Sequence, residues 1–341
     1  KRIKFIMAYT TIPKSSDYMT ASIWTGNGTK ITTGFSPDLI WFKARNAVSY
    51  AGILNAITGY DKYLQSFSTD AETTSAGMMV TDSTGYTPGS VLSSNSYVGW
   101  SWKANGAGVS NTSGSITSTV SASATSGFSI VKWTGTGANA TVGHGLSTAP
   151  KWVICKRIDA DDGWWTYINS IGAGGEIILN STSAQGSNGG VLWNSTNPTS
   201  SVFSVGTNGG VNASSGTYIA YCFAEKQGYS KFGSYTGNGN ADGTFVYTGF
   251  KVAMIICKNT GAAQDWIIKD NTRDIDNPVD DVLYPNGSYA EDNGATVDFL
   301  SNGFKCRTTA ANTNQSGNTF IYMAFAENPF TSSTGTPVTA R

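Results

Sequence analysis

Charged side chains and histidine are scarce in this sequence of 341 residues. Charged residues make up 13% of the chain, 22 basic and 22 acidic residues cancel, and His144 is the only histidine. A balanced and sparse charge provides no basic surface for nucleic acid or for an anionic membrane. No apolar run approaches the roughly 20 residues of a transmembrane helix, so we expect neither nucleic-acid binding nor membrane insertion.

Cysteine is also rare, with four residues and no Cys-x-x-Cys pair. This pattern predicts neither a zinc site nor a disulfide framework, and free thiols fit assembly in a reducing cytoplasm. With one histidine, a Ser-His-Asp or Cys-His catalytic arrangement is not expected. By contrast, 40 glycines and 12% aromatic residues favour short strands joined by tight turns.

One pattern of elements occurs three times, at a spacing of roughly 100 residues. An aromatic residue begins a glycine-containing turn, an apolar strand ending in lysine follows, and an aromatic strand closes the copy. The turns lie at 24–28, 133–137 and 235–239, the apolar strands at 39–43, 152–156 and 254–258, and the closing strands at 96–102, 217–223 and 319–325. Cys155 and Cys257 share a place with Phe42, so we interpret this place as a packing position.

The repeats predict an all-β fold of three tandem antiparallel β-sandwich domains of jelly-roll or concanavalin/LamG-like type. Short strands separated by turn signals, without a helical period, are typical of such sandwiches. The expected parts are an N-terminal arm at 1–17, repeat one at 18–105, a Gly/Ser/Thr-rich linker at 106–126, repeat two at 127–227, repeat three at 228–330 and a tail at 331–341. The uncharged linker predicts a flexible joint between repeats one and two.

Individual strands can be predicted from alternation. In repeat one, Val98, Trp100 and Trp102 are expected on one face of a strand. In repeat two the expected strands are Phe128–Trp133, Ala140–Val142, Trp152–Arg157, Trp164–Ile168, Ile177–Leu179, Val202–Val205 and Tyr218–Phe223. At the N-terminus, residues 1–6 combine three basic and three apolar residues, which is too short for a signal peptide, and we expect translation to begin at Met7.

Three groups of residues are candidates for chemistry. His144 matches Thr33 and Thr248 of the other repeats, so we interpret it as a turn residue rather than a general base. Loop carboxylates can bind calcium, but the acidic loops here lack the EF-hand spacing, and we favour the interpretation that they are solvated or form turns. The candidates are Asp274, Asp276, Asp280 and Asp281; a second acidic loop, Asp159–Asp162, is the poorer candidate. No motif selects a carboxylate pair for glycoside hydrolysis, so we expect no enzyme and no cofactor.

Tryptophan beside acidic residues is the fourth candidate. Trp164 and Trp165 follow Asp162, and Trp266 follows Asp265 at a comparable place in repeat three. Adjacent residues of a strand face opposite sides, so one of Trp164 and Trp165 is expected to point outward. An outward Trp is a candidate sugar platform or protein contact. The alternative is that these residues pack on a sandwich face or between repeats.

The motifs resemble those of a family of tandem-repeat structural proteins from tailed, especially marine, bacteriophages. The resemblance rests on Met-Ala-Tyr-Thr-Thr at 7–11, Tyr-Thr-Gly-Asn-Gly at 235–239, Gly-Phe-x-Pro-Asp-Leu-x-Trp-x-Lys at 34–43, Tyr-Met-Ala-Phe-Ala-Glu-Asn-Pro-Phe at 322–330 and Thr-Ala-Arg at 339–341. It implies a virion protein, often labelled tail fibre or tail-associated, with lectin-like sandwich domains. It supplies no active-site residues.

From this resemblance we expect a non-enzymatic virion protein that is assembled in the bacterial cytoplasm and contributes to attachment to host-surface glycans. Other virion proteins and further copies of the chain are the expected partners. A head decoration or fibre-shaft protein with subunit contacts alone is the alternative, and a polysaccharide-depolymerising glycosidase is a third possibility. Aromatic residues suit interfaces as well as they suit glycans.

Overall fold

The structure is a computed structural model that describes residues 10–92 and 94–329; the expected start at Met7 and the tail at 331–341 lie outside them. Antiparallel β-sheets make up the described chain, which confirms the all-β prediction. Helical turns are short: α1 (Gly209–Asn212), η1 (Ser15–Asp17) and η2 (Ser90–Leu92). None of the helices in the described residues is long and apolar enough to span a membrane.

Repeat one contributes a six-stranded sheet of order β1-β9-β3-β4-β5-β6 and a three-stranded sheet of order β2-β8-β7. Their bounds are β1 (Met19–Thr25), β2 (Ile31–Thr32), β3 (Leu39–Ala44), β4 (Ala51–Asn55), β5 (Gly59–Leu64), β6 (Thr73–Thr74), β7 (Met79–Asp82), β8 (Gly85–Pro88) and β9 (Ser96–Trp102).

The next stretch forms a six-stranded sheet of order β10-β11-β12-β19-β14-β15 and two small sheets, β13-β18 and β16-β17. The bounds are β10 (Val109–Asn111), β11 (Ser118–Ser123), β12 (Phe128–Thr134), β13 (Ala140–Gly143), β14 (Trp152–Arg157), β15 (Trp164–Ile168), β16 (Gly175–Glu176), β17 (Gly186–Ser187), β18 (Val202–Val205) and β19 (Thr217–Phe223). Six of the seven strands expected in repeat two are therefore confirmed, and residues 177–179 are not a strand.

Repeat three contains two four-stranded sheets, of order β20-β27-β22-β23 and β21-β26-β25-β24. The bounds are β20 (Ser230–Thr236), β21 (Phe245–Tyr247), β22 (Phe250–Asn259), β23 (Ile267–Asp270), β24 (Val279–Val282), β25 (Asp292–Leu300), β26 (Gly303–Cys306) and β27 (Thr319–Pro329).

The same four-strand unit recurs three times, as β1-β9-β3-β4, β12-β19-β14-β15 and β20-β27-β22-β23. The register also repeats. Trp102 of β9 pairs with Met19 and Leu39, Phe223 pairs with Phe128 and Trp152, and Phe325 pairs with Ser230 and Met254. The repetition in the sequence thus corresponds to a repetition in strand order and pairing.

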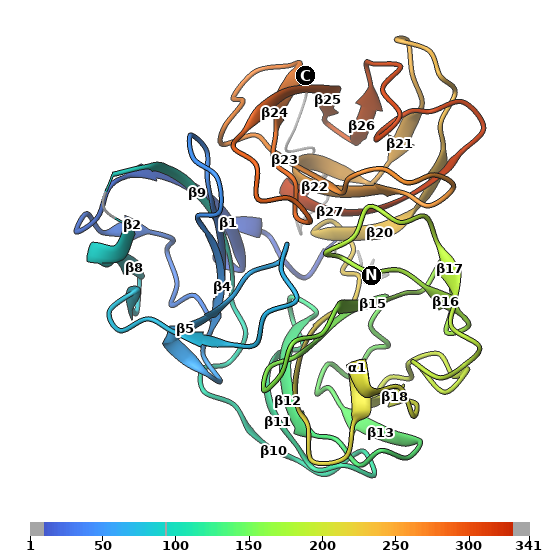
Figure 1. Cartoon of the computed structure of the whole chain (residues 1–341). Coiled ribbons are helices and arrows are strands. Elements are labelled where there is room, and N and C mark those ends of the chain that lie inside the picture. The colour runs from blue at the N-terminus through green and yellow to red at the C-terminus, as the bar shows by residue number, and fades with distance from the viewer. Residues whose placement is uncertain (1–9, 93, 330–341) are drawn as a thin grey trace, which may run out of the picture.

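The three units surround a shared hydrophobic core. Figure 1 shows three lobes, blue, green and orange, around a common centre. There the equivalent residues Trp102, Phe223 and Phe325 meet, with ring centroids 5.7 to 6.1 Å apart and edge-to-face geometry. Val98, Trp100 and Trp102 all join this core, as the alternation predicts. Aromatic rings of this geometry stabilise a core beyond their buried area.

The opposite face of each unit has a core of its own. Trp24 and Tyr97 belong to the core of repeat one, Trp133 and Tyr218 to that of repeat two, and Tyr235 and Phe320 to that of repeat three. In each repeat the two named rings are stacked, at 5.0 to 5.3 Å. The closing strands are therefore buried on both faces, which explains their almost continuous apolar sequence.

The lysine that ends the apolar strand joins each repeat to another. Lys43 Nζ donates to the Gly287 carbonyl of repeat three at 2.6 Å, Lys156 Nζ donates to the Thr69 carbonyl of repeat one at 2.9 Å, and Lys258 Nζ donates to the Thr182 carbonyl of repeat two at 3.2 Å. Burial lowers the pKa of Lys43 and of Lys258 to about 8 and also lowers that of Lys156. Each repeat donates to one neighbour and accepts from the other, so the contacts close into a ring.

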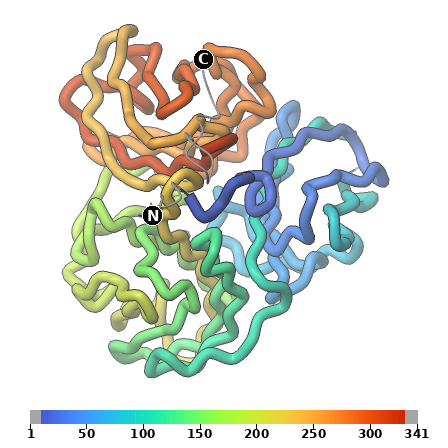
Figure 2. Tube along the Cα trace, turned by 180° about the vertical axis from the view of Figure 1, so that it is seen from behind, coloured from blue at the N-terminus to red at the C-terminus, as the bar shows by residue number. Residues whose placement is uncertain are grey.

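Residues 106–126 are not the flexible linker that their composition predicts. They include β10 and β11, and β11 pairs with β12 across five residue pairs, from Thr119 opposite Lys132 to Ser123 opposite Phe128. In Figure 2 this connector, in teal, runs from the blue lobe along the green one. Repeat one packs against both other repeats through the shared core, so its position is fixed as firmly as theirs.

Candidate functional site

An open pocket of about 220 Å³ lies in repeat one, beside β4, β5 and η2. Its ten lining residues are Phe42, Ser49, Tyr50, Ala51, Tyr63, Gln65, Ser75, Met78, Val91 and Leu92. None of these side chains is charged. The pocket therefore favours a neutral ligand, which it can contact with aromatic rings, aliphatic groups, hydroxyls and an amide.

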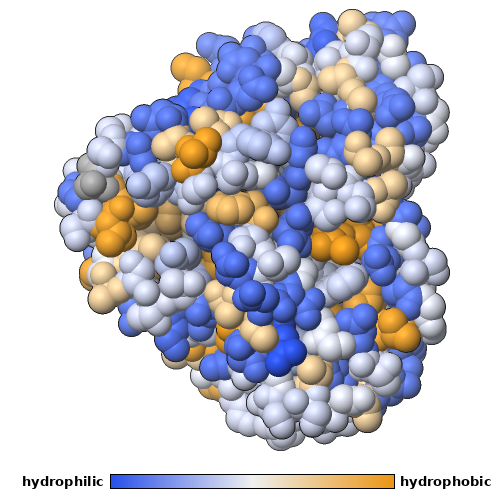
Figure 3. All heavy atoms as spheres, in the orientation of Figure 1, coloured by the Kyte–Doolittle hydropathy of each residue, from blue (hydrophilic) through white to orange (hydrophobic). Residues whose placement is uncertain are grey.

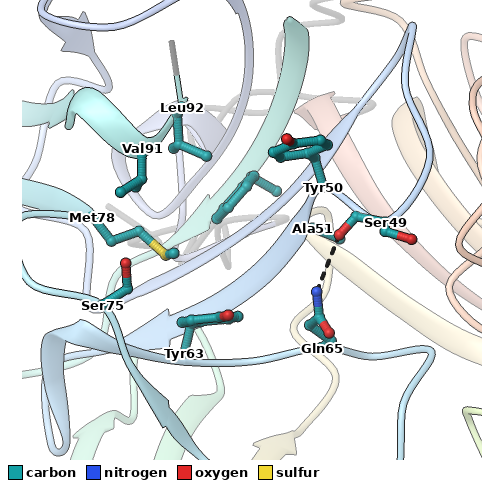
Figure 4. A pocket seen from close by; sticks show the side chains of 10 residues that line it. Ser49, Tyr50, Ala51, Tyr63, Gln65, Ser75, Met78, Val91 and Leu92 are labelled. Carbon is teal, nitrogen blue, oxygen red and sulfur yellow. Dashed lines mark hydrogen bonds between the residues drawn. The ribbon is translucent and has the colours of Figure 1, made fainter.

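Two tyrosines bracket the pocket. Figure 4 shows Tyr50 above and Tyr63 below, with Met78 and Val91 on one side and Gln65 on the other. Tyr50 is 50% exposed, and Val91 is 43% exposed. Tyr63 is partly buried and packs against the core of repeat one. Rings that flank a hollow can take the flat apolar face of a ligand, and their hydroxyl groups can form hydrogen bonds.

Cross-strand packing explains why an aromatic ring lines this pocket in repeat one. Phe42 lies opposite Gly52, whereas the equivalent Cys155 lies opposite Trp165 and Cys257 lies opposite Ile267. A Cβ at Gly52 would lie 2.7 Å from Cε1 of Phe42, so only glycine leaves room for this ring. A large residue on one strand is thus balanced by a small one on the next.

The rim of the pocket is fixed by repeat three. Ser49, which has a φ of 66°, donates its N–H to the Ser288 carbonyl at 2.8 Å. Gln65 Nε2 donates to the Ser49 carbonyl at 3.1 Å, as the dashed line in Figure 4 shows. The polar edge is therefore positioned before any ligand arrives, which reduces the entropy that binding costs.

The acidic loop before Trp164 turns inward on its own chain. Asp162 Oδ1 accepts from Trp165 Nε1 at 2.9 Å and from the Gly163 N–H at 2.7 Å. The Asp162 N–H donates to the Thr69 carbonyl of repeat one. Trp165 is partly buried. This pair braces the boundary between repeats one and two, and its use as a ligand contact stays a prediction.

Trp164 and Trp266 do not lie on the surface. Both are fully buried in the core between repeats. Trp164 Nε1 donates to the carbonyls of Gln65 and Ser68 in repeat one, both at 3.1 Å, and Trp266 Nε1 donates to the Ile178 carbonyl of repeat two at 3.1 Å. The structure thus places them as contacts between repeats, the alternative interpretation of these residues, and not as sugar platforms.

Three of the four calcium candidates lie together. One carboxylate oxygen from each of Asp274, Asp280 and Asp281 lies within 4.8 Å of the others, and Asp276 does not belong to this group. Asp274 Oδ2 already accepts the backbone N–H groups of Asp280 and Asp281, at 3.0 and 2.8 Å. Burial, opposed by these bonds, raises the pKa of Asp274. Calcium binding stays a prediction, and the hydrogen bonds account for the cluster without an ion.

Cations also approach the acidic cluster. Arg45 of repeat one binds Asp281 Oδ2 at 3.1 Å. Lys269 Nζ donates to the Asp281 carbonyl, and burial lowers the pKa of Lys269 to about 7. Asp281 thus serves as a link between repeats one and three.

His144 and the cysteines take structural positions. His144 is buried; its Nδ1 accepts the Leu146 N–H at 3.2 Å, and its Nε2 lies 3.1 Å from the Thr199 carbonyl. Both ring nitrogens are therefore occupied by backbone groups. All four cysteines are buried, and the burial of Cys155 and Cys257 agrees with the packing position expected for these two.

The sequence does not predict the pocket, because no motif marks Tyr50 and Tyr63 as neighbours. Both are tyrosines of repeat one alone, placed where the copies diverge between the apolar strand and the closing strand. That local divergence was the available signal. Elsewhere on the face seen in Figure 3, apolar side chains form small separate patches among polar ones.

The fold and the site define an all-β protein built on three copies of one antiparallel unit, with an aromatic pocket in the first copy. The sequence model of a family described as a domain of unknown function (DUF7483) matches residues 14–329, and the chain belongs to this family. The match spans all three copies, so the family's domain is the whole three-part assembly. Neither a curated protein nor a solved structure matches the chain.

Proposed function

We propose that the chain is a non-enzymatic virion protein of a tailed bacteriophage, fibre-borne or otherwise tail-associated, which contributes to attachment by binding a neutral host-surface glycan in the pocket of repeat one. Each repeat is in this proposal a two-sheet sandwich of jelly-roll or concanavalin-like type. The observation that carries the glycan part is the uncharged pocket between Tyr50 and Tyr63. The motif resemblance supports the virion part.

A sugar has two kinds of surface, and the pocket contains groups that complement both. A pyranose ring has an apolar C–H face, which stacks on an aromatic side chain, and a rim of hydroxyl groups. Tyr50 and Tyr63 supply the rings, and Gln65 and Ser75 supply polar groups at the edge. Because no lining residue is charged, neutral hexoses suit the site better than acidic sugars do.

Binding of purified protein to an array of bacterial surface polysaccharides tests the proposal. We expect saturable binding to neutral glycans and a loss of at least about tenfold in affinity, or about 1.4 kcal/mol, in Tyr50→Ala and in Tyr63→Ala. Tyr247→Ala is the matched control, because Tyr247 is an exposed tyrosine, 59% accessible, on β21 of repeat three. Binding that is absent, or equally strong in all three variants, would overturn the glycan site.

A purely structural role is the second candidate. In it the chain is a head decoration or a fibre-shaft protein, with further copies or other virion proteins as partners. The burial of Trp164 and Trp266 between repeats supports this candidate in one respect, because it removes both residues from the set of outward glycan contacts. Electron microscopy of the particle separates the two: density at a tail tip with the Tyr50 pocket outward supports attachment, and density tiled on a shell or along a shaft supports the structural role.

The glycosidase alternative has a separate readout. Incubation of host polysaccharide with the protein is expected to leave its chain length unchanged on size-exclusion chromatography. Shortening of the polysaccharide would contradict the non-enzymatic proposal even if the pocket variants also lost binding.

A further inference from the structure

The three equivalent first strands of the repeats end up in different surroundings. β12 is covered on its outer side by β11, whereas β1 and β20 are the end strands of their sheets. An end strand presents a row of backbone N–H and C=O groups with no ladder partner, and such edges pair readily with another strand. Within residues 10–92 and 94–329 there is thus one copy of this strand with a partner on its outer side and two copies without one.

The covered copy shows how an added segment is held. β11 lies antiparallel to β12, with Val120 opposite Val131. Ahead of it, Asp38 of repeat one holds the start of the connector: its Oδ2 accepts the Ala104 N–H at 2.6 Å, and its Oδ1 accepts the Gly106 N–H at 3.0 Å. The segment that covers β12, Ser118–Ser123, reads Ser-Thr-Val-Ser-Ala-Ser and carries no charge.

β20 is protected by side chains and by a turn. Its residue Phe232 donates its N–H to Glu225 Oε1 at 2.7 Å, and Ser230 donates its N–H to the Lys226 carbonyl at 2.9 Å. The outward backbone groups at this end of β20 are therefore satisfied inside the chain. A strand that added here would have to displace both bonds, which makes β20 an unfavourable edge.

Among the described residues, the outward N–H groups of β1 have no such partner, although the Ala21 carbonyl accepts Thr20 Oγ1 at 3.3 Å. The Tyr18 carbonyl bonds to Lys103 and the Gly26 N–H bonds to Asn95, so the even-numbered residues direct their backbone groups toward β9 and its flanks. The intervening Ala21 and Ile23 direct theirs outward, because the direction alternates along an antiparallel strand. Glu327 has the same repeat position as Glu225, which binds the Phe232 N–H of β20. The carboxylate of Glu327 is bound by Lys251 and Asn271 instead.

A groove adjoins this edge at the boundary of repeats one and three. It has a volume of about 110 Å³ and is lined by Thr20 and Ala21 on one side and by Met254 and Asn271 on the other. Met254 is the repeat-three equivalent of Leu39, because Met254 pairs with Phe325 as Leu39 pairs with Trp102. Leu39 directly follows Asp38, the residue that holds the start of the connector. The side chain of Ile23 is 47% exposed beside the edge, which adds an apolar contact for an incoming strand.

We propose that β1 is a β-augmentation site, which binds an extended, uncharged segment rich in Ser, Thr and β-branched residues from another polypeptide. The segment pairs antiparallel with Met19–Thr25 in the register that β11 adopts on β12. Backbone hydrogen bonds to Ala21 and Ile23 supply the affinity, and the groove beside Met254 selects small side chains. This site is independent of the Tyr50 pocket.

A synthetic peptide with the sequence of residues 104–123 is the probe, because its counterpart in the chain already covers the equivalent strand. Fluorescence anisotropy of the labelled peptide with the full chain is expected to give saturable binding. Ile23→Pro should reduce the affinity at least about tenfold, since proline removes an outward N–H that an edge strand can lose without unfolding. Ser234→Pro, the equivalent change on β20, should leave binding unchanged.

A second substitution and defined negative results complete the test of β1 as a binding site. If Ile23→Pro does not fold, Ile23→Lys places a charge at the same edge and should weaken binding as well. No binding to the wild-type chain, or equal loss in the Ser234→Pro variant, would overturn the proposal. So would binding that arises only after removal of residues 330–341, because the chain's own terminus would then be the occupant. Self-association that Ile23→Lys abolishes, without peptide binding, would assign the edge to a second copy instead.

Discussion

A single turn position illustrates how the repeats substitute one side chain for another. Thr248 Oγ1 donates to the Phe250 carbonyl at 3.0 Å, and Thr33 Oγ1 donates to the Phe35 carbonyl at 2.6 Å. In repeat two, His144 Nδ1 accepts the Leu146 N–H instead. Each side chain bonds the backbone two residues ahead, so the position requires a local hydrogen bond and not an imidazole.

Replacement of His144 tests this interpretation with an isosteric pair. Thr and Val have almost the same shape, and only Thr can form the bond that Thr33 and Thr248 form. We expect His144→Thr to be more stable than His144→Val by about 1 kcal/mol, the typical value of one buried hydrogen bond. Chemical denaturation measures the difference. Equal stability of the two variants would contradict a hydrogen-bonding role for this position.

The same residue predicts a pH dependence. Burial lowers the pKa of His144 below its ordinary value of 6.5, although the Thr199 carbonyl opposes this. Below pH 6.5 the unfolded chain therefore binds a proton that the folded chain does not, and the free energy of unfolding falls as the pH falls from there toward the lowered pKa. With one histidine in the chain, His144→Thr should remove this slope. A slope that persists in the variant would show that other groups cause it.

At the scale of elements, the glycine-containing turn after each first strand is held from a distance. In repeat three, Asn314 Nδ2 donates to the carbonyls of Asn240 and Thr308, both at 2.8 Å, while its Oδ1 accepts the Asn238 N–H at 3.0 Å. Asn212 holds the matching turn in repeat two in the same way. The sequence predicts both turns. The buried asparagine that holds each turn, which we call the clamp, lies some 75 residues away and has no local sequence pattern.

Loss of this clamp should be costly. Asn314 is fully buried, so Asn314→Ala leaves several backbone groups unsatisfied, and we expect the free energy of unfolding to fall by about 2–4 kcal/mol. Asn27→Ala in the matching turn of repeat one is the control. Asn27 is exposed and makes one long bond, of 3.4 Å to the Ser90 carbonyl, so its loss should change stability by less than about 0.5 kcal/mol. Similar losses in both would contradict the clamp.

The connector marks the limit of prediction from the sequence at this scale. Strands with large apolar residues, such as β14 and β15, were predicted at their observed bounds. β11 was interpreted as flexible because its side chains are small and uncharged. Its stability comes from the ladder with β12, a partner that composition does not reveal. β11 does contribute Val120 to the core of repeat two, but one apolar residue among small polar ones gives no strand signal in the sequence.

At the scale of the molecule, the sequence aligned the three closing strands but could not show that they meet. Trp102, Phe223 and Phe325 fall at the same repeat position, which is equally compatible with three separate cores. The one available signal was the burial of both strand faces, since β9, β19 and β27 are apolar at consecutive positions. A strand with two apolar faces needs cover on both sides, and here the other repeats provide it.

A shared core predicts that the repeats unfold together. Phe325→Ala removes one of the three central rings and should cost about 3–5 kcal/mol. Because Phe325 contacts Trp102 and Phe223, the loss should loosen repeat two as well as repeat three. The buried cysteines report this separately: Cys155 and Cys222 lie in repeat two, and Cys257 and Cys306 lie in repeat three.

Pulsed thiol labelling at increasing denaturant, with mass spectrometry of each cysteine peptide, measures the coupling. Burial raises the pKa of these thiols, to about 12 for Cys222 and Cys257, so none reacts in the folded chain and all react on unfolding. We expect one midpoint for both pairs in the wild type and an equal shift of both in Phe325→Ala. A shift confined to Cys257 and Cys306 would mean that the repeats are independently stable. In that case the contacts around Trp102 would only dock preformed units, and the closed ring of lysine bonds would be a consequence of folding rather than part of its cooperativity.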